Sequence, residues 1–305
     1  MSATNSRATV RPVTLARLVE TTHLCASEPR TTGDIESTLG VTHRRARETL
    51  LEAIRIGLID EDDSCEPSDY TTTHVGERFV SAVREEDWGT VSDLLATHSP
   101  HYGAFLRAIE SVAPASLGVI LEELENKEEH SHQTYNQTSV EVVGDWAERL
   151  GAIQRNAFTG NYYPIENQEV AGDFQYNFLQ VYDDLEETAG VSLRQRYLSI
   201  PELREEFCER CRCTRQVFDD SLRMLADQNV GKLELSGAPI DTAAKDAKLG
   251  IKEITLDGNE GLVSTTQSTE RVMAGIEQFG KQYYYLAVHD RDVSYDSTTE
   301  RLDHE

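Results

Sequence analysis

Apolar residues recur at helical spacing over the first eighty-odd residues, with polar segments between the runs. Residues 13–26 carry one such pattern, and residues 31–40 carry a second that begins with a Thr and ends with a Gly. A third helix is predicted over 42–57. Residues 58–73 predict a strand, a polar loop and a return strand, and 74–83 predict a closing helix. The pattern therefore indicates three helices, a hairpin and a fourth helix.

The third of these helices has Thr42 as its N-terminal cap and Gly57 at its end. Its apolar residues lie three or four positions apart, so they share one inner face: Ala46, Leu50, Ala53 and Ile54. The basic residues at its start lie off that face. They are therefore expected to be available to a partner.

Helix, helix, tight turn, helix and two-stranded wing is the order of the winged helix-turn-helix superfamily, which residues 13–84 resemble. The resemblance also rests on two phrases, IGLID and YTTTHVGERF, in which a Gly-Leu-Ile exit is followed by a Tyr, a Thr and a Gly on the closing helix. It implies a nucleic-acid-binding or protein-interaction module, because winged helices serve both purposes.

The same order of elements is predicted twice more. After a connecting amphipathic stretch at 87–99, a second copy begins near His101, with a third helix over 137–150 and a hairpin over 152–165. A third copy follows an acidic linker around 166–173, with a third helix near 214–227.

The third copy has an enlarged wing. Its two sides are predicted at 231–239 and 249–258, with a long insertion around Asp241–Lys248 between them, and 280–288 predicts a further strand from its aromatic and β-branched content.

The predicted fold is mainly α with small β-wings, an α+β class, arranged as tandem winged helix-turn-helix domains. The expected divisions are a first winged-helix domain with an N-terminal arm at 1–87, a second at 88–165, a winged-helix-like third with the enlarged wing at 166–290, and a disordered acidic tail at 291–305.

The charge is far from balanced, with 29 Lys and Arg against 54 Asp and Glu and a formal net charge of −25. The aromatic residues are spread through periodic apolar segments, as in a folded protein, so the acidic residues are expected on folded surfaces. Only six of the basic residues are Lys, and the others are Arg. This composition resembles that of proteins from extremely halophilic archaea. Salt at ~1 M shortens the screening length to ~3 Å, so the acidity does not exclude DNA as a partner.

The start of the third helix carries the strongest candidate for DNA contact. Arg side chains can fork onto guanine or phosphate, and this end of a recognition helix reaches base edges in a major groove. Residues 1–57 hold eight Arg and six acids, a net of +2, so the other 248 residues carry −27. The candidate residues are Thr42, His43, Arg44, Arg45 and Arg47.

Two alternatives stay open for this region. The arginines could instead pair with neighbouring acids on a solvated face, such as Arg47 with Glu48 or Glu52. The segment from Thr4 to Arg11 could follow the DNA backbone as an arm or form a disordered terminus.

A second, weaker set of DNA-contact candidates lies at the corresponding turn of the third copy: Arg212, Thr214, Arg215 and Gln216. Acidic neighbours such as Glu205, Glu209 and Asp219 are expected to repel DNA there. The second copy has polar, almost uncharged residues before its third helix, which suit a protein surface or a spacer.

Cys208, Cys211 and Cys213 form the one motif that suggests a metal, yet a tetrahedral zinc site needs four ligands and no second pair exists in the sequence. Packing in a core or turn is the favoured interpretation, with metal binding and redox sensing as alternatives. His130 and His132 are expected to be solvated. No phosphate loop, nucleophile elbow or other catalytic spacing occurs, so neither enzymatic activity nor a cofactor is expected.

The sequence has five cysteines, an odd number, and it lacks the hydrophobic core of a signal peptide, so we expect a cytoplasmic protein. It also lacks an apolar run of ~18 residues, so no membrane span is expected. The preferred function is DNA binding, either as a transcription regulator or as the DNA-engaging subunit of a genome-maintenance or defence complex. Double-stranded DNA and a protein partner or homodimer are the expected partners. The alternative is an interaction or scaffold subunit resembling the tandem winged-helix accessory subunits of chromosome-condensing complexes.

Overall fold

The computed structural model describes residues 9–64, 66–126, 133–167, 172–188, 197–237, 272–278 and 280–296. They form a mainly helical protein with small antiparallel sheets, as the predicted α+β class requires. The described residues divide into two compact units. The first holds 9–155 and Asn161–Pro164, and the second holds Asn156–Gly160 and the described residues from 165 onward. None of the helices within these ranges is both long enough and apolar enough to cross a membrane.

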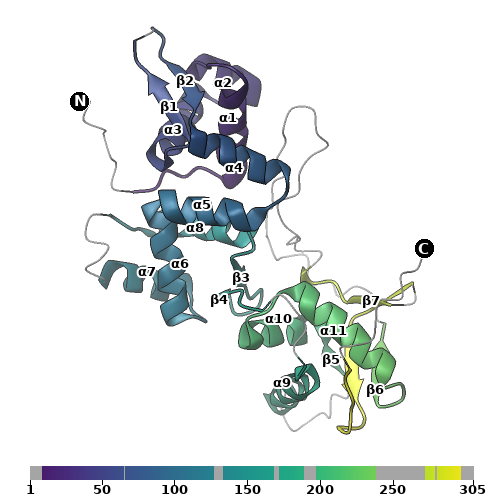
Figure 1. Ribbon diagram of the computed structural model, residues 1–305. Coiled ribbons are helices and arrows are strands. Elements are labelled where there is room, and N and C mark those ends of the chain that lie inside the picture. The colour runs from purple at the N-terminus through teal and green to yellow at the C-terminus, as the bar shows by residue number, and fades with distance from the viewer. Residues whose placement is uncertain are drawn as a thin grey trace. The chain divides into compact units, whose positions relative to one another are not determined.

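The first half of the first unit contains the predicted helices and hairpin. Its elements are α1 (Leu15–Ser27), α2 (Thr32–Leu39), α3 (His43–Ile56), the antiparallel strands β1 (Ile59–Asp62) and β2 (Asp69–Thr72), and α4 (His74–Arg84) (Figure 1). Thr31 caps α2 in a capping box with Asp34, whose pKa is lowered by hydrogen bonds from Thr31. The predicted helix ends at Gly40 and Gly57 are confirmed, since both have left-handed backbones with φ of 60° and 81°.

The second half of this unit continues with further helices and a second hairpin. These are α5 (Trp88–His98), α6 (Pro100–Val112), α7 (Leu117–Asn126), α8 (Gln137–Arg149), β3 (Ile153–Arg155) and β4 (Tyr162–Pro164). The helix predicted over 137–150 is thus α8. Helix α5 packs against both α4 and α6 (Figure 1).

One continuous core joins the two halves of the first unit, with buried apolar residues from Val10 to Ile153. Trp146 of α8 is fully buried, and its indole Nε1–H donates to the carbonyl oxygen of Val13 at 3.0 Å. The two predicted domains at 1–87 and 88–165 therefore share a single hydrophobic interior, which fixes α8 to the segment that leads into α1.

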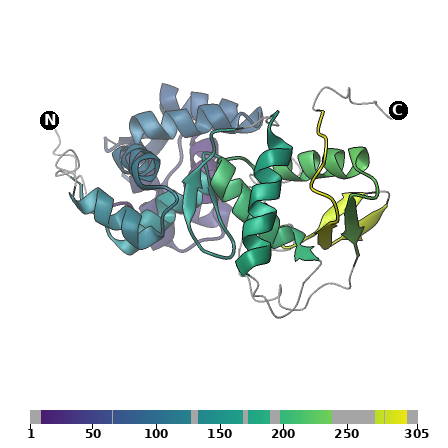
Figure 2. The same cartoon turned by 90° about the horizontal axis from the view of Figure 1, so that it is seen from below.

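The second unit packs three helices against short strands. Its elements are α9 (Phe174–Thr188), β5 (Leu198–Ser199), α10 (Ile200–Cys211), α11 (Arg215–Gln228), β6 (Leu233–Ser236), β7 (Ile276–Gln278), β8 (Lys281–Tyr283) and β9 (Tyr285–Val288). Aromatic rings fill its core, with Phe174 in contact with Phe178, Phe207 and Phe218. Strands β6 and β7 lie against α11. Figure 2 shows the light-green helix of this unit beside its yellow strands, which come from the C-terminal part of the chain.

The sheets of this unit differ from the predicted wing. Strand β6 lies in the predicted first side, but it pairs with β9 in the order β5-β9-β6, and the predicted second side at 249–258 lies outside the described residues. The strand predicted over 280–288 is divided at Tyr284 into β8, which pairs with β7, and β9. Residues 291–296, at the start of the predicted tail, hydrogen-bond to the end of α11 through Asn229 and Gln228, and 297–305 lie outside the described residues.

Candidate nucleic-acid interface

The start of α3 is built by the tight turn that separates it from α2. Gly40 ends α2 in a left-handed conformation, and the Thr42 hydroxyl caps α3 by accepting from the Arg45 N–H. Of the predicted inner face, Ala46, Leu50 and Ala53 are buried, whereas Ile54 is only partly buried. Ile56 takes the buried place because it lies three residues after Ala53 on the same stripe.

The basic candidates all lie on the outer face of α3. The side chains of Arg44, Arg45 and His43 are 87%, 60% and 65% exposed, and Arg47 and Thr42 are also exposed. These positions are close together because residues three and four apart share one side of a helix. The structure thus brings the five candidates into one patch at the α3 N-terminus.

Acidic residues neutralise part of this patch. Glu48 accepts from both Arg44 (3.0 Å) and Arg45 (3.5 Å), and His43 Nδ1 lies 3.1 Å from a carboxylate oxygen of Glu36. Arg47 makes neither a hydrogen bond nor an ion pair with the described part of the chain. Pairing on the surface therefore involves Arg44 and Arg45, whereas the sequence had suggested Arg47.

A buried ionic cluster lies on the inner side of α3, in its C-terminal half, and it was not predicted from the sequence. Glu52 is fully buried and accepts from Arg11 (3.4 Å) and from the guanidinium of Arg55. Arg55 in turn donates to Nδ1 of His101 in α6 (3.1 Å). Arg11 ends the segment for which the sequence allowed either an arm on DNA or a disordered terminus, and it is instead turned inward at 8% exposure. The apolar neighbours Val10, Pro12 and Val13 were the available sign that this segment enters the core.

The hairpin beside α3 is strongly acidic. Its exposed acids are Asp60, Glu61, Asp62, Asp63 and Glu66. Tyr70 of β2 is buried, its hydroxyl donates to Glu61, and burial raises its pKa. A hairpin of this composition repels phosphates at low salt, so α3 is the better candidate of the two elements for a nucleic-acid interface.

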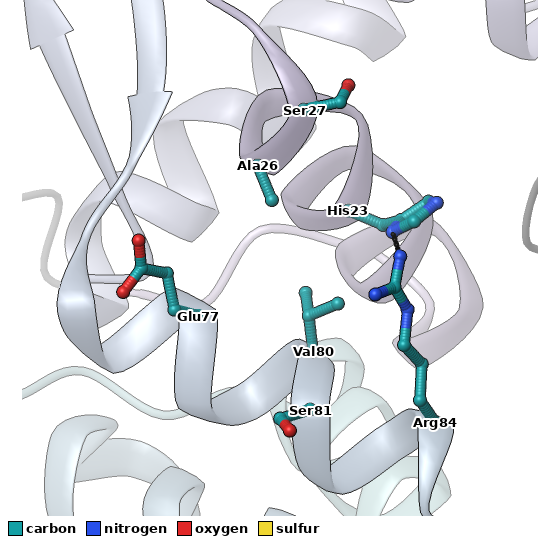
Figure 3. Close-up of a pocket in the computed structure, with 7 residues that line it drawn as sticks. All are labelled: His23, Ala26, Ser27, Glu77, Val80, Ser81 and Arg84. Atoms are coloured by element: carbon teal, nitrogen blue, oxygen red, sulfur yellow. Dashed lines mark hydrogen bonds between the residues drawn. The ribbon is translucent and has the colours of Figure 1, made fainter.

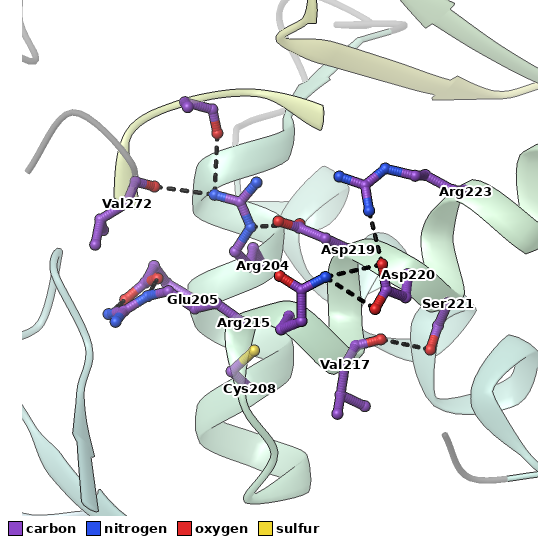
Figure 4. Close-up of polar contacts among 12 residues, drawn as sticks. Arg204, Glu205, Cys208, Arg215, Val217, Asp219, Asp220, Ser221, Arg223 and Val272 are labelled. Atoms are coloured by element: carbon purple, nitrogen blue, oxygen red, sulfur yellow. Dashed lines mark hydrogen bonds and ion pairs between the residues drawn. The ribbon is translucent and has the colours of Figure 1, made fainter. Parts of the chain in front are cut away.

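The second candidate set has structural roles at the corner between α10 and α11. Thr214 caps α11, and Arg212 adopts a left-handed backbone at the end of α10, with φ of 54°. Arg215 forms a two-pronged pair with the fully buried Glu205 (2.5 and 2.7 Å), and Gln216 donates to Asp220. Figure 4 shows Arg215 beside Glu205. The Arg215 guanidinium is therefore already committed inside the protein.

Arg204 completes this polar cluster from α10. It is 1% exposed, pairs with Asp219 of α11 at 2.6 Å, and donates to the carbonyl oxygens of Val272 and Ala274, both at 3.0 Å (Figure 4). Burial raises the pKa of Asp219. Arg204 thus fixes the chain that returns toward β7 onto the two helices.

A groove of about 440 Å³ lies between α1 and α4 (Figure 3). Arg84 donates to Nδ1 of His23 at 3.2 Å on one side, and Glu77 lies on the other. Opposite charges in one groove do not offer the positive surface that nucleic-acid phosphates need. The α3 patch is the better interface on this criterion.

The described cysteines and histidines make no metal centre. Across the residues that the structure describes, no group of three or more His, Cys, Asp or Glu side chains is placed to hold an ion. Cys208 and Cys213 are buried at the α10–α11 corner, Cys25 is buried in the first unit, and Cys65, His130 and His132 lie outside the described residues. In comparisons with known proteins, no family model, curated protein or solved structure matches this chain.

Proposed function

We propose that this chain is a DNA-binding protein built from tandem winged helix-turn-helix units, in which α3 enters the major groove of double-stranded DNA. The observation that carries the proposal is the exposed patch of Arg44, Arg45 and Arg47 at the N-terminus of a capped helix. The succession of α1, α2, α3, the β1–β2 hairpin and α4 supports the assignment to winged helices.

The charge distribution favours α3 over the other third helices. Residues 1–57 have a net charge of +2 against −27 for the rest of the chain. At α11, Arg215 is held by Glu205, and α8 begins with the uncharged Gln137, Thr138 and Ser139. Arginines on α3 can exchange Glu48 for phosphate or guanine because their side chains are exposed and long.

Screening by salt allows an acidic protein to bind DNA, which is also negatively charged. In the molar salt that we infer for its cytoplasm, repulsion acts only over ~3 Å, and short-range hydrogen bonds supply the affinity. We place the protein in a halophilic archaeon on its scarce Lys and abundant acids.

A matched pair of variants tests the proposal. Arg44, Arg45 and Arg47 are replaced by Ala in one variant, and the exposed Arg78, Arg84 and Arg107 in the other. Both variants lose three positive charges, so the net charge of the protein changes by the same amount in each. DNA sites are first selected from random duplexes with the parent chain. The affinity of the parent and of each variant for these sites is then measured by fluorescence anisotropy at several KCl concentrations. The first variant is expected to lose at least tenfold in affinity, at ~1–3 kcal/mol for each base contact, and the second much less.

Two results would overturn the proposal. One is equal affinity of the α3 variant and the parent chain. The other is a parent chain that binds no duplex at molar KCl while it remains folded.

The second candidate function is a protein-interaction subunit, and the acidic β1–β2 hairpin favours it. Five exposed acids on the wing suit a basic protein surface better than a DNA backbone. In that case the chain alone would show little sequence preference for DNA and would co-purify with an ATPase from its own cells.

A further inference from the structure

Two thiols meet at the corner between α10 and α11. The sulfur atoms of Cys208 and Cys213 lie 3.9 Å apart, and the two residues are 0% and 3% exposed. Cys208 sits one turn after Glu205 on α10 (Figure 4). We propose that Cys208 and Cys213 form a reversible dithiol–disulfide pair, oxidised by low-molecular-weight disulfides. This proposal does not depend on DNA binding.

The backbone explains why these two side chains meet. Arg212 takes a left-handed conformation after α10, and the Cys213 N–H then donates back to the Cys208 carbonyl oxygen at 3.3 Å. This helix ending brings the side chains of the hydrogen-bonded residues into contact. Packing alone accounts for two small apolar residues here, but two sulfur atoms can also form a bond.

A neighbouring segment holds the corner in this shape. The N–H groups of Glu166 and Asn167 both donate to the Arg212 carbonyl oxygen (2.9 and 3.0 Å), and the Asn167 side chain donates to the Cys211 carbonyl oxygen (2.8 Å). The sulfurs are therefore kept near one another while the backbone stays fixed. A disulfide needs a separation of about 2.05 Å, and side-chain rotation can supply the remaining approach.

The chemistry balances through two exchange steps. One cysteine thiolate attacks the sulfur–sulfur bond of the oxidant, which releases one thiol and leaves a mixed disulfide. The second cysteine attacks the protein sulfur of that mixed disulfide and releases the second thiol. The two cysteines lose two electrons and two protons, which the oxidant takes up. Burial raises the pKa of Cys208 well above its usual range, so the reaction is slow at neutral pH.

Cys211 provides the internal control. It is part-exposed and adjacent to the pair, and burial raises its pKa to about 11. If exposure alone decided the product, Cys211 would carry the modification. If the sulfur–sulfur distance decides it, Cys208 and Cys213 become linked.

The test treats the folded full chain with oxidised glutathione for several hours at pH 8 in molar KCl. Remaining thiols are alkylated after unfolding, and the chain is digested with trypsin. Cleavage after Arg210 and Arg212 separates the three cysteines. The expected product joins the peptide of 205–210 to that of 213–215, and dithiothreitol releases it. Cys211→Ala is expected to keep this product, whereas Cys208→Ala and Cys213→Ala lose it.

Three outcomes would overturn the proposal: cross-links that involve Cys211, glutathione adducts on Cys208 or Cys213 without a cross-link, or three thiols that all remain open to alkylation. The peptide map of the unsubstituted chain decides by itself if a variant fails to fold.

Discussion

Arg55 of α3 donates a hydrogen bond to Nδ1 of His101 of α6 across 3.1 Å. A guanidinium group can only donate, so Nδ1 of this imidazole acts as the acceptor and carries no proton. The same guanidinium pairs with the buried Glu52, which also holds Arg11. The C-terminal half of α3 is thereby tied both to the chain before α1 and to the second half of the first unit.

Glu52→Gln is expected to lower the free energy of unfolding of the first unit by about 3–5 kcal/mol, because two largely buried arginines lose their counter-charge. Glu48→Gln on the same helix is the control and should cost less than about 1 kcal/mol, since its partners are exposed arginines. Urea unfolding in molar KCl measures both. Similar losses for the two variants would contradict this role for the buried cluster.

Gly76→Ala is expected to destabilise the first unit by roughly 1–3 kcal/mol or more. An added Cβ would lie 2.1 Å from the Leu58 carbonyl oxygen, so α4 must move away from the chain that enters β1. Gly118→Ala in α7 is the matched control. Its Cβ meets nothing nearer than 3.9 Å, and Ala at an exposed helix position should be neutral or stabilise by about 0.5 kcal/mol. Thermal unfolding in parallel distinguishes the two.

Arg215→Ala should destabilise the second unit without weakening DNA binding. Its removal leaves Glu205 buried, with the Ala157 N–H as its one remaining hydrogen-bond donor among the residues that the structure describes, at an expected cost of about 3–5 kcal/mol. Gln216→Ala, on the exposed side of the same turn, should change stability by less than about 0.5 kcal/mol. If Arg215→Ala kept full stability but lost DNA affinity, the structural role would be wrong and Arg215 would be a DNA-contact residue.

Neutralising the hairpin tests how close it comes to DNA. The combined variant Asp60→Asn, Asp63→Asn and Glu66→Gln removes three exposed charges and spares Glu61, which accepts from Tyr70. DNA affinity should rise several-fold in low salt and match the parent at molar KCl, where repulsion is screened. Anisotropy titrations at both salt concentrations measure the change. An equal gain at both concentrations would point to altered contacts rather than to charge.

The melting temperature should climb steeply from low salt to molar KCl. Exposed acids with few basic partners repel one another, and ions reduce that repulsion. Differential scanning calorimetry in KCl, with sucrose at equal osmolality as the non-ionic control, separates screening from general exclusion effects. A flat KCl profile would remove the halophile inference.

The sequence by itself determined the features that depend on neighbouring residues. Helix ends at Gly40 and Gly57 follow from local backbone preferences, and the helices over 42–56, 137–150 and 214–227 follow from apolar spacing. The exposure of Arg44, Arg45 and Arg47 also follows, since a residue off the apolar stripe of a helix faces outward. Each of these properties is set within a few residues along the chain.

Only the tertiary structure decided which distant groups meet. Arg11 and Glu52 are forty-one positions apart, and nothing in either segment marks them as partners. Likewise, β6 pairs with β9 across a long stretch of chain, and Arg215 turns toward Glu205 because α10 presents a buried carboxylate there. A charge in the sequence has many possible partners. Packing selects one of them, because a buried charge must be paired where it lies.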